Sequence, residues 1–313
     1  MELMGRRFGE PKTLRKVIEE EGSVLAPCVY DCLSAKIIEN TGFKAMCLSG
    51  ASLAMAFCGV PDIGLVSLGD LEQVVRRITQ MANIPMIVDI DTGYGNELNV
   101  MYTCERIAGA GALAVHLEDQ TFPKRCGHLG GKQVIPREAY FSKVRAAHSV
   151  LKDTDCMLIA RTDSYHTHGV EEAIARNLGS LDAGADITFT EGTGTRADIA
   201  RIAKEVPGLK MFDMVCNGAS PLISFDELKE LGYQLVTAPT VSFGGAFKGI
   251  TEFAERTMKD RSDFYATRSG IPPIEMFGLF GIKEWLGAAQ ECNKSIQDAY
   301  NLKCAEDKTR TDN

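Results

Sequence analysis

Four short apolar runs of the sequence end on ionisable residues. They are followed in chain order by Asp89 and Asp91, by Glu118 and Asp119, by Arg161 and Asp163, and by Glu191. Carboxylates that meet in one place raise one another's pKa unless a cation joins them. Oxygen ligands without a well-spaced set of His or Cys favour Mg²⁺, with Mn²⁺ as the alternative, over zinc. The pattern therefore predicts a hard divalent metal wherever these run ends come together.

A second group of reactive residue types is the segment Lys124-Arg125-Cys126-Gly127-His128, which continues to Lys132. A thiol flanked by two cations and an imidazole should have its thiolate favoured by the positive charge, which is typical of a reactive cysteine. The glycines at 127, 130 and 131 suit a mobile flap that closes over a substrate and excludes water. We expect a reactive Cys126 on a gating loop.

Other histidines and glycines favour structural roles. His166 and His168 lie two residues apart without a third metal ligand, which favours a solvated loop. His116 lies inside an apolar run and is expected to be a core histidine. Gly93-Tyr94-Gly95 lacks both the remaining Rossmann glycines and the lysine of a phosphate loop, so no nucleotide is expected.

Eight apolar, β-branched runs alternate with amphipathic stretches, the pattern typical of βα units and a parallel sheet. The expected strands are Val24 to Tyr30, Ala45 to Ser49, Pro85 to Asp89, Leu113 to Leu117, Met157 to Arg161, Ile187 to Glu191, Lys210 to Met214 and Leu235 to Ala238. Eight such units predict a closed (β/α)8 TIM-type barrel, in which catalytic groups stand at the carboxyl ends of the strands. This is where the ionisable residues lie.

The chain of 313 residues is expected to be one barrel domain over 1–313. Helices are predicted over Ala246 to Lys259 and over Pro273 to Asn301; because the latter has no strand to cover, a neighbouring subunit is its expected partner. A net charge of -8 argues against nucleic acid and anionic lipid as partners, and no run is apolar enough for a membrane helix. Ten scattered cysteines without a secretory signal predict free thiols in the reducing cytoplasm.

Four motifs together resemble the isocitrate lyase and phosphoenolpyruvate mutase superfamily. They are Asp-Ile-Asp-Thr-Gly-Tyr-Gly-Asn at 89–96, Glu-Asp-Gln at 118–120, Lys-Arg-Cys-Gly-His at 124–128 and Ala-Arg-Thr-Asp at 160–163. The cysteine loop resembles the lyase branch, because phosphonate-forming mutases lack that cysteine. The resemblance implies a barrel whose C-terminal helical segment, 260–301 here, is exchanged between subunits of a homotetramer.

The resemblance also implies roles for individual residues. It implies that Asp91 binds Mg²⁺ directly, that Asp89, Glu118 and Asp62 act through water, and that the substrate is a small carboxylate. The remaining implied residues are Ser49, Gly50, Ala51 and Arg161 around the pyruvyl end, Cys126 as general acid, and Lys124, Gly127, His128 and Glu191 around the nascent carboxylate. The implied reaction is cleavage of the C2–C3 bond of a 2-hydroxy acid, with a metal-bound water, Asp62 or Glu191 as the base.

Departures from the pattern bear on the substrate. The methylisocitrate lyase pattern has Asn-x-Thr and an arginine at the positions where this chain has Asp213, Val215 and Gly244. With these residues the chain would repel a third carboxylate. Pro239 agrees with the pattern of dimethylmalate lyases, whereas the otherwise similar oxaloacetate hydrolases favour a serine at this position. The preferred expectation is 2,3-dimethylmalate cleaved to pyruvate and propionate. The alternatives are methylisocitrate lyase, which gives pyruvate and succinate, oxaloacetate hydrolase, another alkylmalate lyase, and a catalytically silent metabolite-binding scaffold.

Overall fold

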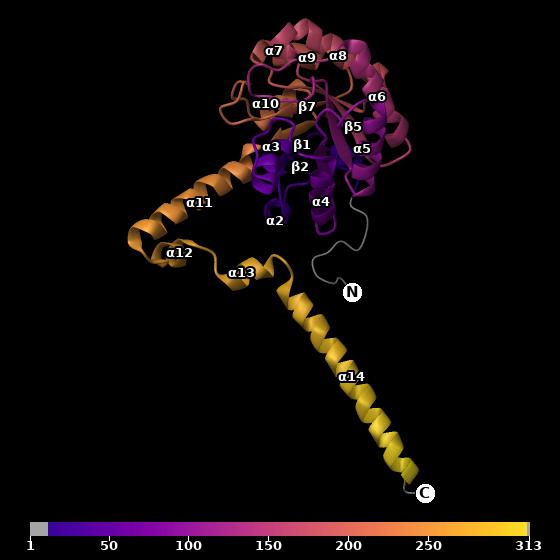
Figure 1. Cartoon of the computed structure of the whole chain (residues 1–313), viewed down its shortest axis with the longest axis vertical. Coiled ribbons are helices and arrows are strands. Elements are labelled where there is room, and N and C mark those ends of the chain that lie inside the picture. The colour runs from indigo at the N-terminus through magenta and orange to yellow at the C-terminus, as the bar shows by residue number, and fades with distance from the viewer. Residues whose placement is uncertain (1–11, 312–313) are drawn as a thin grey trace. The chain divides into compact units, whose positions relative to one another are not determined.

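The computed structural model describes residues 12–311, with side chains over 12–296. Eight parallel strands form a closed barrel in sequence order (Figure 1). The strands are β1 (Val24–Val29), β2 (Met46–Leu48), β3 (Met86–Asp89), β4 (Ala114–Glu118), β5 (Met157–Thr162), β6 (Ile187–Thr190), β7 (Leu209–Asp213) and β8 (Leu235–Ala238). The prediction of a (β/α)8 barrel is confirmed, and each predicted strand agrees within two residues at either end.

Helices connect successive strands and surround them (Figure 1). They are α1 (Leu14–Glu21), α2 (Cys32–Thr41), α3 (Gly50–Leu53), the π-helix η1 (Ala54–Cys58), α4 (Leu68–Thr79), α5 (Glu97–Gly109), α6 (Arg137–Leu151), α7 (Tyr165–His168), α8 (Val170–Asp182), α9 (Arg196–Glu205) and α10 (Phe225–Leu231). Several begin at a side-chain cap, as at Ser67 and Asn96, where reciprocal hydrogen bonds satisfy the free amides of the first turn.

The pleat of the strands decides which residues enter the barrel. In β5, Met157 and Ile159 pack in the cluster inside the barrel, whereas Leu158 and Ala160 pack in the cluster shared with the helices. Because side chains alternate between the two faces, Arg161 belongs to the inner set. The same alternation applies to the other strands, so residues at their carboxyl ends converge above the core.

The C-terminal segment forms a separate unit. Among the described residues the first unit covers 12–252, and the second begins at Phe253. Helix α11 (Thr240–Asp260) leads to α12 (Phe264–Ser269), α13 (Pro273–Gly278) and α14 (Ile282–Thr311). The helices expected over 246–259 and 273–301 are present, and Leu279 to Gly281 interrupt the second. The single domain over 1–313 and the exchanged segment 260–301 stay predictions.

Over residues 12–311, none of the helices combines the length and apolar character needed to cross a bilayer. The nine cysteines at positions 28 to 292 are free thiols.

Candidate active site

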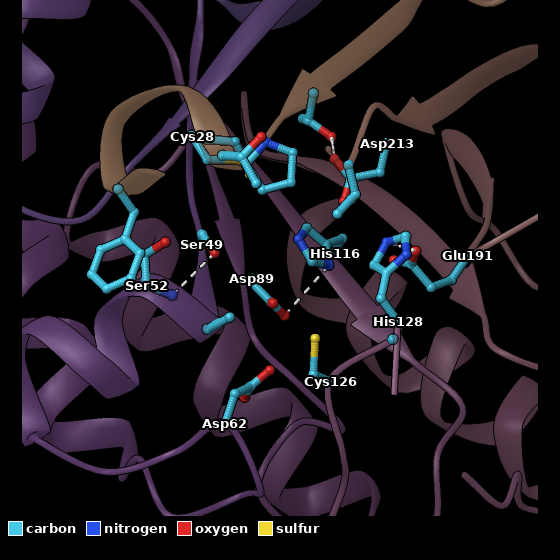
Figure 2. Close-up of a pocket in the computed structure, with 18 of the residues that line it drawn as sticks. Cys28, Ser49, Ser52, Asp62, Asp89, His116, Cys126, His128, Glu191 and Asp213 are labelled. Atoms are coloured by element: carbon cyan, nitrogen blue, oxygen red, sulfur yellow. Dashed lines mark hydrogen bonds and ion pairs between the residues drawn. The ribbon is translucent and has the colours of Figure 1, made fainter. Parts of the chain in front are cut away.

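One cavity of about 250 Å³ opens at the carboxyl ends of the strands. Its wall includes predicted site residues from eight places in the sequence, namely Ser49, Ala51, Asp62, Asp89, Lys124, Cys126, Gly127, His128, Arg161, Glu191, Asp213 and Pro239 (Figure 2). The pleat explains the convergence, since strand-end residues follow inward-facing neighbours such as Ile87, Ile159 and Met211. The structure therefore brings Asp62, Asp89 and the loop cysteine to one cavity with most of the substrate-binding residues, whereas Asp91 and Glu118 are buried and do not line it.

Asp62, Asp89, Asp91 and Glu118 form an acid cluster around Lys124. The Lys124 Nζ lies 2.6 Å from Asp62 Oδ1 and 2.7 Å from Asp91 Oδ1. Burial alone would lower the pKa of Lys124, but the four carboxylates raise it well above its usual range. Lys124 is thus an ammonium ion, and it lies with the acid cluster rather than beside His128 and Glu191.

The acid cluster has the properties of a cation site. Asp91 Oδ1 is buried with the Lys124 ammonium 2.7 Å away, and both Oε atoms of Glu118 are buried and accept no hydrogen bond, with Arg161 Nη2 3.3 Å from Oε2. Burial, reinforced by Asp89, raises the pKa of Asp91 to about 6. Burial also raises the pKa of Glu118 well above its ordinary value. A divalent cation would favour the ionised forms of these groups and use their free lone pairs, so the residues present fit Mg²⁺.

Arg161 connects the acid cluster to the far side of the cavity. Its Nη2 lies 3.3 Å from Glu118 Oε2 and 3.4 Å from Glu191 Oε2. Its Nε donates to Asp163 at 2.9 Å, which fixes the plane of the guanidinium. Burial raises the pKa of Glu191, but the Arg161 guanidinium and the His128 ring outweigh it and hold that pKa well below its ordinary value. Arg161 is therefore held ready as a donor in the cavity.

The loop 124–132 is closed over the cavity by its own hydrogen bonds. The Cys126 amide donates to the Asp62 carbonyl at 3.2 Å. The Gln120 side chain donates to the Arg125 carbonyl at 2.8 Å and accepts from the Arg125 amide at 2.9 Å. The Lys132 Nζ bonds to the Gly127 carbonyl and pairs with Asp163 at 3.2 Å. These contacts direct the Cys126 thiol into the cavity (Figure 2).

The expectation that positive charge favours a Cys126 thiolate is wrong. Burial raises the pKa of the Cys126 thiol above its ordinary value, and Asp62 adds to the rise. The two flanking cations do not offset this, because Lys124 is engaged by the acid cluster and Arg125 is exposed. Cys126 is therefore a neutral thiol with a proton to give, which is the state a general acid requires.

His128, Glu191 and Asp213 form a second group on the side of the cavity opposite the acid cluster (Figure 2). Their candidate ligand atoms lie within 4.8 Å of one another, and among residues 12–296 no other such group was found. The Ala219 amide donates to His128 Nδ1 at 2.9 Å, so the ring proton sits on Nε2, which faces Glu191 Oε1 at 2.9 Å. That proton occupies the nitrogen a metal would need. The group is better suited to hydrogen-bonding a substrate than to binding an ion.

Two glycines allow side chains to approach the backbone closely. A Cβ on Gly50 would lie 2.9 Å from Asp89 Oδ2, and one on Gly127 would lie 2.4 Å from Arg161 Nη2 and 2.5 Å from Glu191 Cγ. Ser49 caps α3 through the Ser52 amide, which sets the backbone of residues 49–51 at the cavity edge. Both glycines let charged side chains stand against the main chain.

We expect Gly127→Ala to reduce turnover by about 10²-fold, because the added methyl displaces Arg161 and Glu191. The matched control is Gly130→Ala in the same loop, where an added Cβ meets no atom within 4 Å. Steady-state kinetics and a thermal melt of both variants test the expectation. Equal activities for the two variants would contradict it.

Sequence reasoning missed several residues that line the cavity, among them three that can exchange a proton. His116 was expected in the core, and it is buried, but its ring lines the cavity with Nδ1 3.4 Å from Asp89 Oδ1. Cys28 and Cys47 also line the cavity. The alternation of Ala114, His116 and Glu118 was the signal available for His116, since residues two apart share a face. His166 and His168 lie in the short helix α7 with both rings outside the cavity lining, as expected.

Comparisons with known proteins agree with this geometry. The family model described as phosphoenolpyruvate phosphomutase matches residues 14–258. The chain is 42% identical over 273 residues to the petal death protein of Dianthus caryophyllus, covering 87% of this chain and 85% of that one. It is 36% identical over 271 residues to 2,3-dimethylmalate lyase of Eubacterium barkeri, covering 87% and 94%.

A solved structure of oxaloacetate acetylhydrolase, in complex with the inhibitor 3,3-difluorooxalacetate, superposes with a TM-score of 0.86 at 32% identity. The superposition covers 91% of this chain and 99% of that one.

Proposed function

Because this chain belongs to the phosphoenolpyruvate mutase/isocitrate lyase superfamily, and is on that basis a carbon–carbon lyase, we propose that it cleaves 2,3-dimethylmalate to pyruvate and propionate in a Mg²⁺-dependent reaction. The observation that carries the proposal is that Asp62, Asp89 and Lys124 of the acid cluster line the same cavity as a protonated Cys126. The acid cluster suits a 2-hydroxy acid with its metal, and the Cys126 thiol suits the carbanion formed when the C2–C3 bond breaks.

The proposed reaction divides between the two sides of the cavity. Asp91 would hold Mg²⁺ directly, with Asp89, Glu118 and Asp62 acting through water. When bound, the metal supplies electrostatic stabilisation of negative charge on the 2-oxygen of the substrate. Arg161 and the backbone of residues 49–51 orient the carboxylate beside it. The 2-hydroxyl proton passes to the base, for which Asp62 and Glu191 are the side-chain candidates, and the Cys126 thiol gives its proton to the carbon released by C2–C3 cleavage, which makes the second acid.

Residues around Asp213 favour a substrate smaller than a tricarboxylate. Asp213 Oδ1 accepts a hydrogen bond from Thr237 at 2.6 Å, and Val215, Pro239 and Gly244 line the same part of the cavity. None of these side chains can pair with a third carboxylate, and an unpaired buried charge costs about 1–3 kcal/mol or more. Methyl substituents, in contrast, meet Val215 and Pro239 without penalty. This supports dimethylmalate over methylisocitrate.

A panel of substrates tests the proposal. Purified protein with Mg²⁺ is given 2,3-dimethylmalate, methylisocitrate and oxaloacetate, and pyruvate is followed with lactate dehydrogenase while other acids are identified by proton NMR. We expect pyruvate and propionate from dimethylmalate, with kcat/KM at least about tenfold above that of methylisocitrate. Faster production of succinate, or of oxalate and acetate from oxaloacetate, would replace the substrate assignment. No Mg²⁺-dependent product from any member would overturn the lyase.

The proposal predicts a pH dependence at Asp213. Burial, with Glu191 close by, raises the pKa of Asp213 to about 7. Asp213 is therefore neutral below this pH and negative above it, where it repels an anionic substrate. We expect kcat/KM to fall as pH rises through about 7, and the fall to be absent in Asp213→Asn. Since Glu191, His128 and Cys47 also face Asp213, an unchanged fall in the variant would assign the titration to one of them.

We also propose a cytoplasmic homotetramer in which the segment 260–301 is exchanged between subunits. Large apolar side chains of this segment, including Phe264, Ile274 and Phe277, are more than half exposed within the chain. Burial of such side chains against a second copy removes apolar surface from water. Light scattering of the full chain should give four times the monomer mass, and a monomer would contradict the exchange.

A further inference from the structure

Two cysteines that the reaction does not use face each other in the barrel interior. Cys28 in β1 and Cys47 in β2 are directly opposed partners in the strand register, and both belong to the inner core cluster. Neighbouring strands lie about 4.7–4.9 Å apart. That separation falls inside the range of about 4.4–6.8 Å between Cα atoms joined by a disulfide. We call Cys28 and Cys47 the thiol pair.

The two thiols are in contact and reachable from the cavity. Their side chains are direct neighbours on adjacent strands, and the His116 ring interacts electrostatically with the Cys47 thiol. Both line the cavity, where Cys28 lies above Ser49 (Figure 2), although they are only 4% and 2% exposed. An oxidant no larger than a substrate group can therefore enter the cavity and reach the two thiols, whereas a bulky reagent cannot.

We propose that the thiol pair is an oxidative modification site, which a hydroperoxide converts to a Cys28–Cys47 disulfide. In the first step the Cys47 thiol gives up its proton and its sulfur attacks one peroxide oxygen, the O–O bond breaks, and the leaving hydroxide takes that proton, so that hydrogen peroxide yields a sulfenic acid and one water. In the second step the Cys28 sulfur attacks the Cys47 sulfur, the S–O bond breaks, and a second water leaves. The two thiols lose two electrons, and the peroxide gains them.

The neighbours of Cys47 favour this order of events. The Cys28 thiol and the His116 ring favour negative charge on the Cys47 sulfur and lower the pKa of Cys47 to about 6. The Cys47 side chain and burial raise the pKa of Cys28, which keeps Cys28 as the resolving thiol. A sulfenic acid formed on Cys47 is thus met by an adjacent thiol before a second peroxide can oxidise it further.

Oxidation of the thiol pair reaches the acid cluster through His116. The His116 ring interacts with Cys47 on one side and faces Asp89 at 3.4 Å on the other. A disulfide removes the negative charge of the Cys47 thiolate from beside this ring, two residues before Ser49. The oxidised protein should therefore be less active, and a dithiol such as dithiothreitol should restore it by exchange.

The test uses the full chain treated with hydrogen peroxide near stoichiometric amounts. We expect loss of two thiols per chain without sulfinic acid, and a reducible crosslink between the tryptic peptides Val17–Lys36 and Ala45–Arg76. Mg²⁺ with pyruvate should slow the reaction, because both fill the cavity. Since thiol counts and peptide masses need no substrate, this result is independent of the lyase assignment.

The same two peptides supply matched controls, because Cys32 and Cys58 lie in them. The crosslink should persist in Cys32→Ala and Cys58→Ala and disappear in Cys28→Ala and Cys47→Ala. A crosslink that survives Cys28→Ala, or one that includes Cys126, overturns the proposal. Peroxide that consumes only single thiols, trapped by dimedone without a crosslink in the unmutated chain, overturns it as well, even if a variant fails to fold.

Discussion

Replacing Asp91 by Asn should lower Mg²⁺-dependent turnover by about 10³-fold or more, corresponding to several kcal/mol of lost charge stabilisation. Asp91 contributes a buried carboxylate that pairs with Lys124, and this single positive charge cannot replace that of a divalent ion. Asn is the appropriate replacement because Asp91 has φ 48°, a left-handed conformation that Asn tolerates. Ala would add backbone strain to the loss of charge.

Isothermal titration of Mg²⁺ and steady-state rates measure this effect. The matched control is Asp186→Asn at the opposite rim of the barrel, where the carboxylate accepts from the Leu158 amide at 2.9 Å and pairs with Arg15 at 2.6 Å. This control should lose some stability but keep its Mg²⁺ affinity. If Asp91→Asn binds Mg²⁺ as tightly as the unmutated protein, Asp91 is not the direct ligand.

Replacing Cys126 by Ser should lower turnover by about 10²- to 10⁴-fold, the range attributed to a general acid. The serine hydroxyl is a far weaker acid than the neutral thiol that the cavity holds. Mg²⁺ and pyruvate should still bind, because the backbone amide of residue 126 keeps its hydrogen bond to Asp62 and the loop 124–132 can close. The effect should therefore fall on kcat far more than on KM.

Cys58→Ser is the matched control for this variant. Cys58 is partly buried like Cys126, and burial raises the pKa of its thiol in the same way, but it does not line the cavity. Rapid-quench measurement of pyruvate in a single turnover separates bond cleavage from later steps. Near-normal turnover in Cys126→Ser would remove the thiol from the mechanism.

The strand pattern could be predicted because each strand carries its own apolar run. The segment 157–161 predicted the position of β5 and the placement of Arg161 at its carboxyl end, and both are confirmed. The C-terminal segment was predicted less well. Leu279 to Gly281 break the helix expected over 273–301, because the short helix from Pro273 ends where Gly278 and Gly281 disfavour its continuation.

The electrostatic state of Cys126 could not be read from neighbours in the sequence. Lys124 and Arg125 stand next to it along the chain, yet one turns to Asp62 and Asp91 and the other turns to solvent. Charge acts through space, and residues adjacent in an extended loop point in different directions. The thiol pair could not be predicted for the same reason. Cys28 and Cys47 are separated by a whole βα unit along the chain and become neighbours only through the strand register.

The order of apolar runs, and the ionisable residues that end them, were determined by the sequence alone, because pleat and helix periods are local properties of the chain. Only the tertiary structure decided which protons and charges those residues carry. Barrel closure buries Asp91 and Glu118 and partly buries Cys126, and the cost of charge there depends on every neighbour in three dimensions.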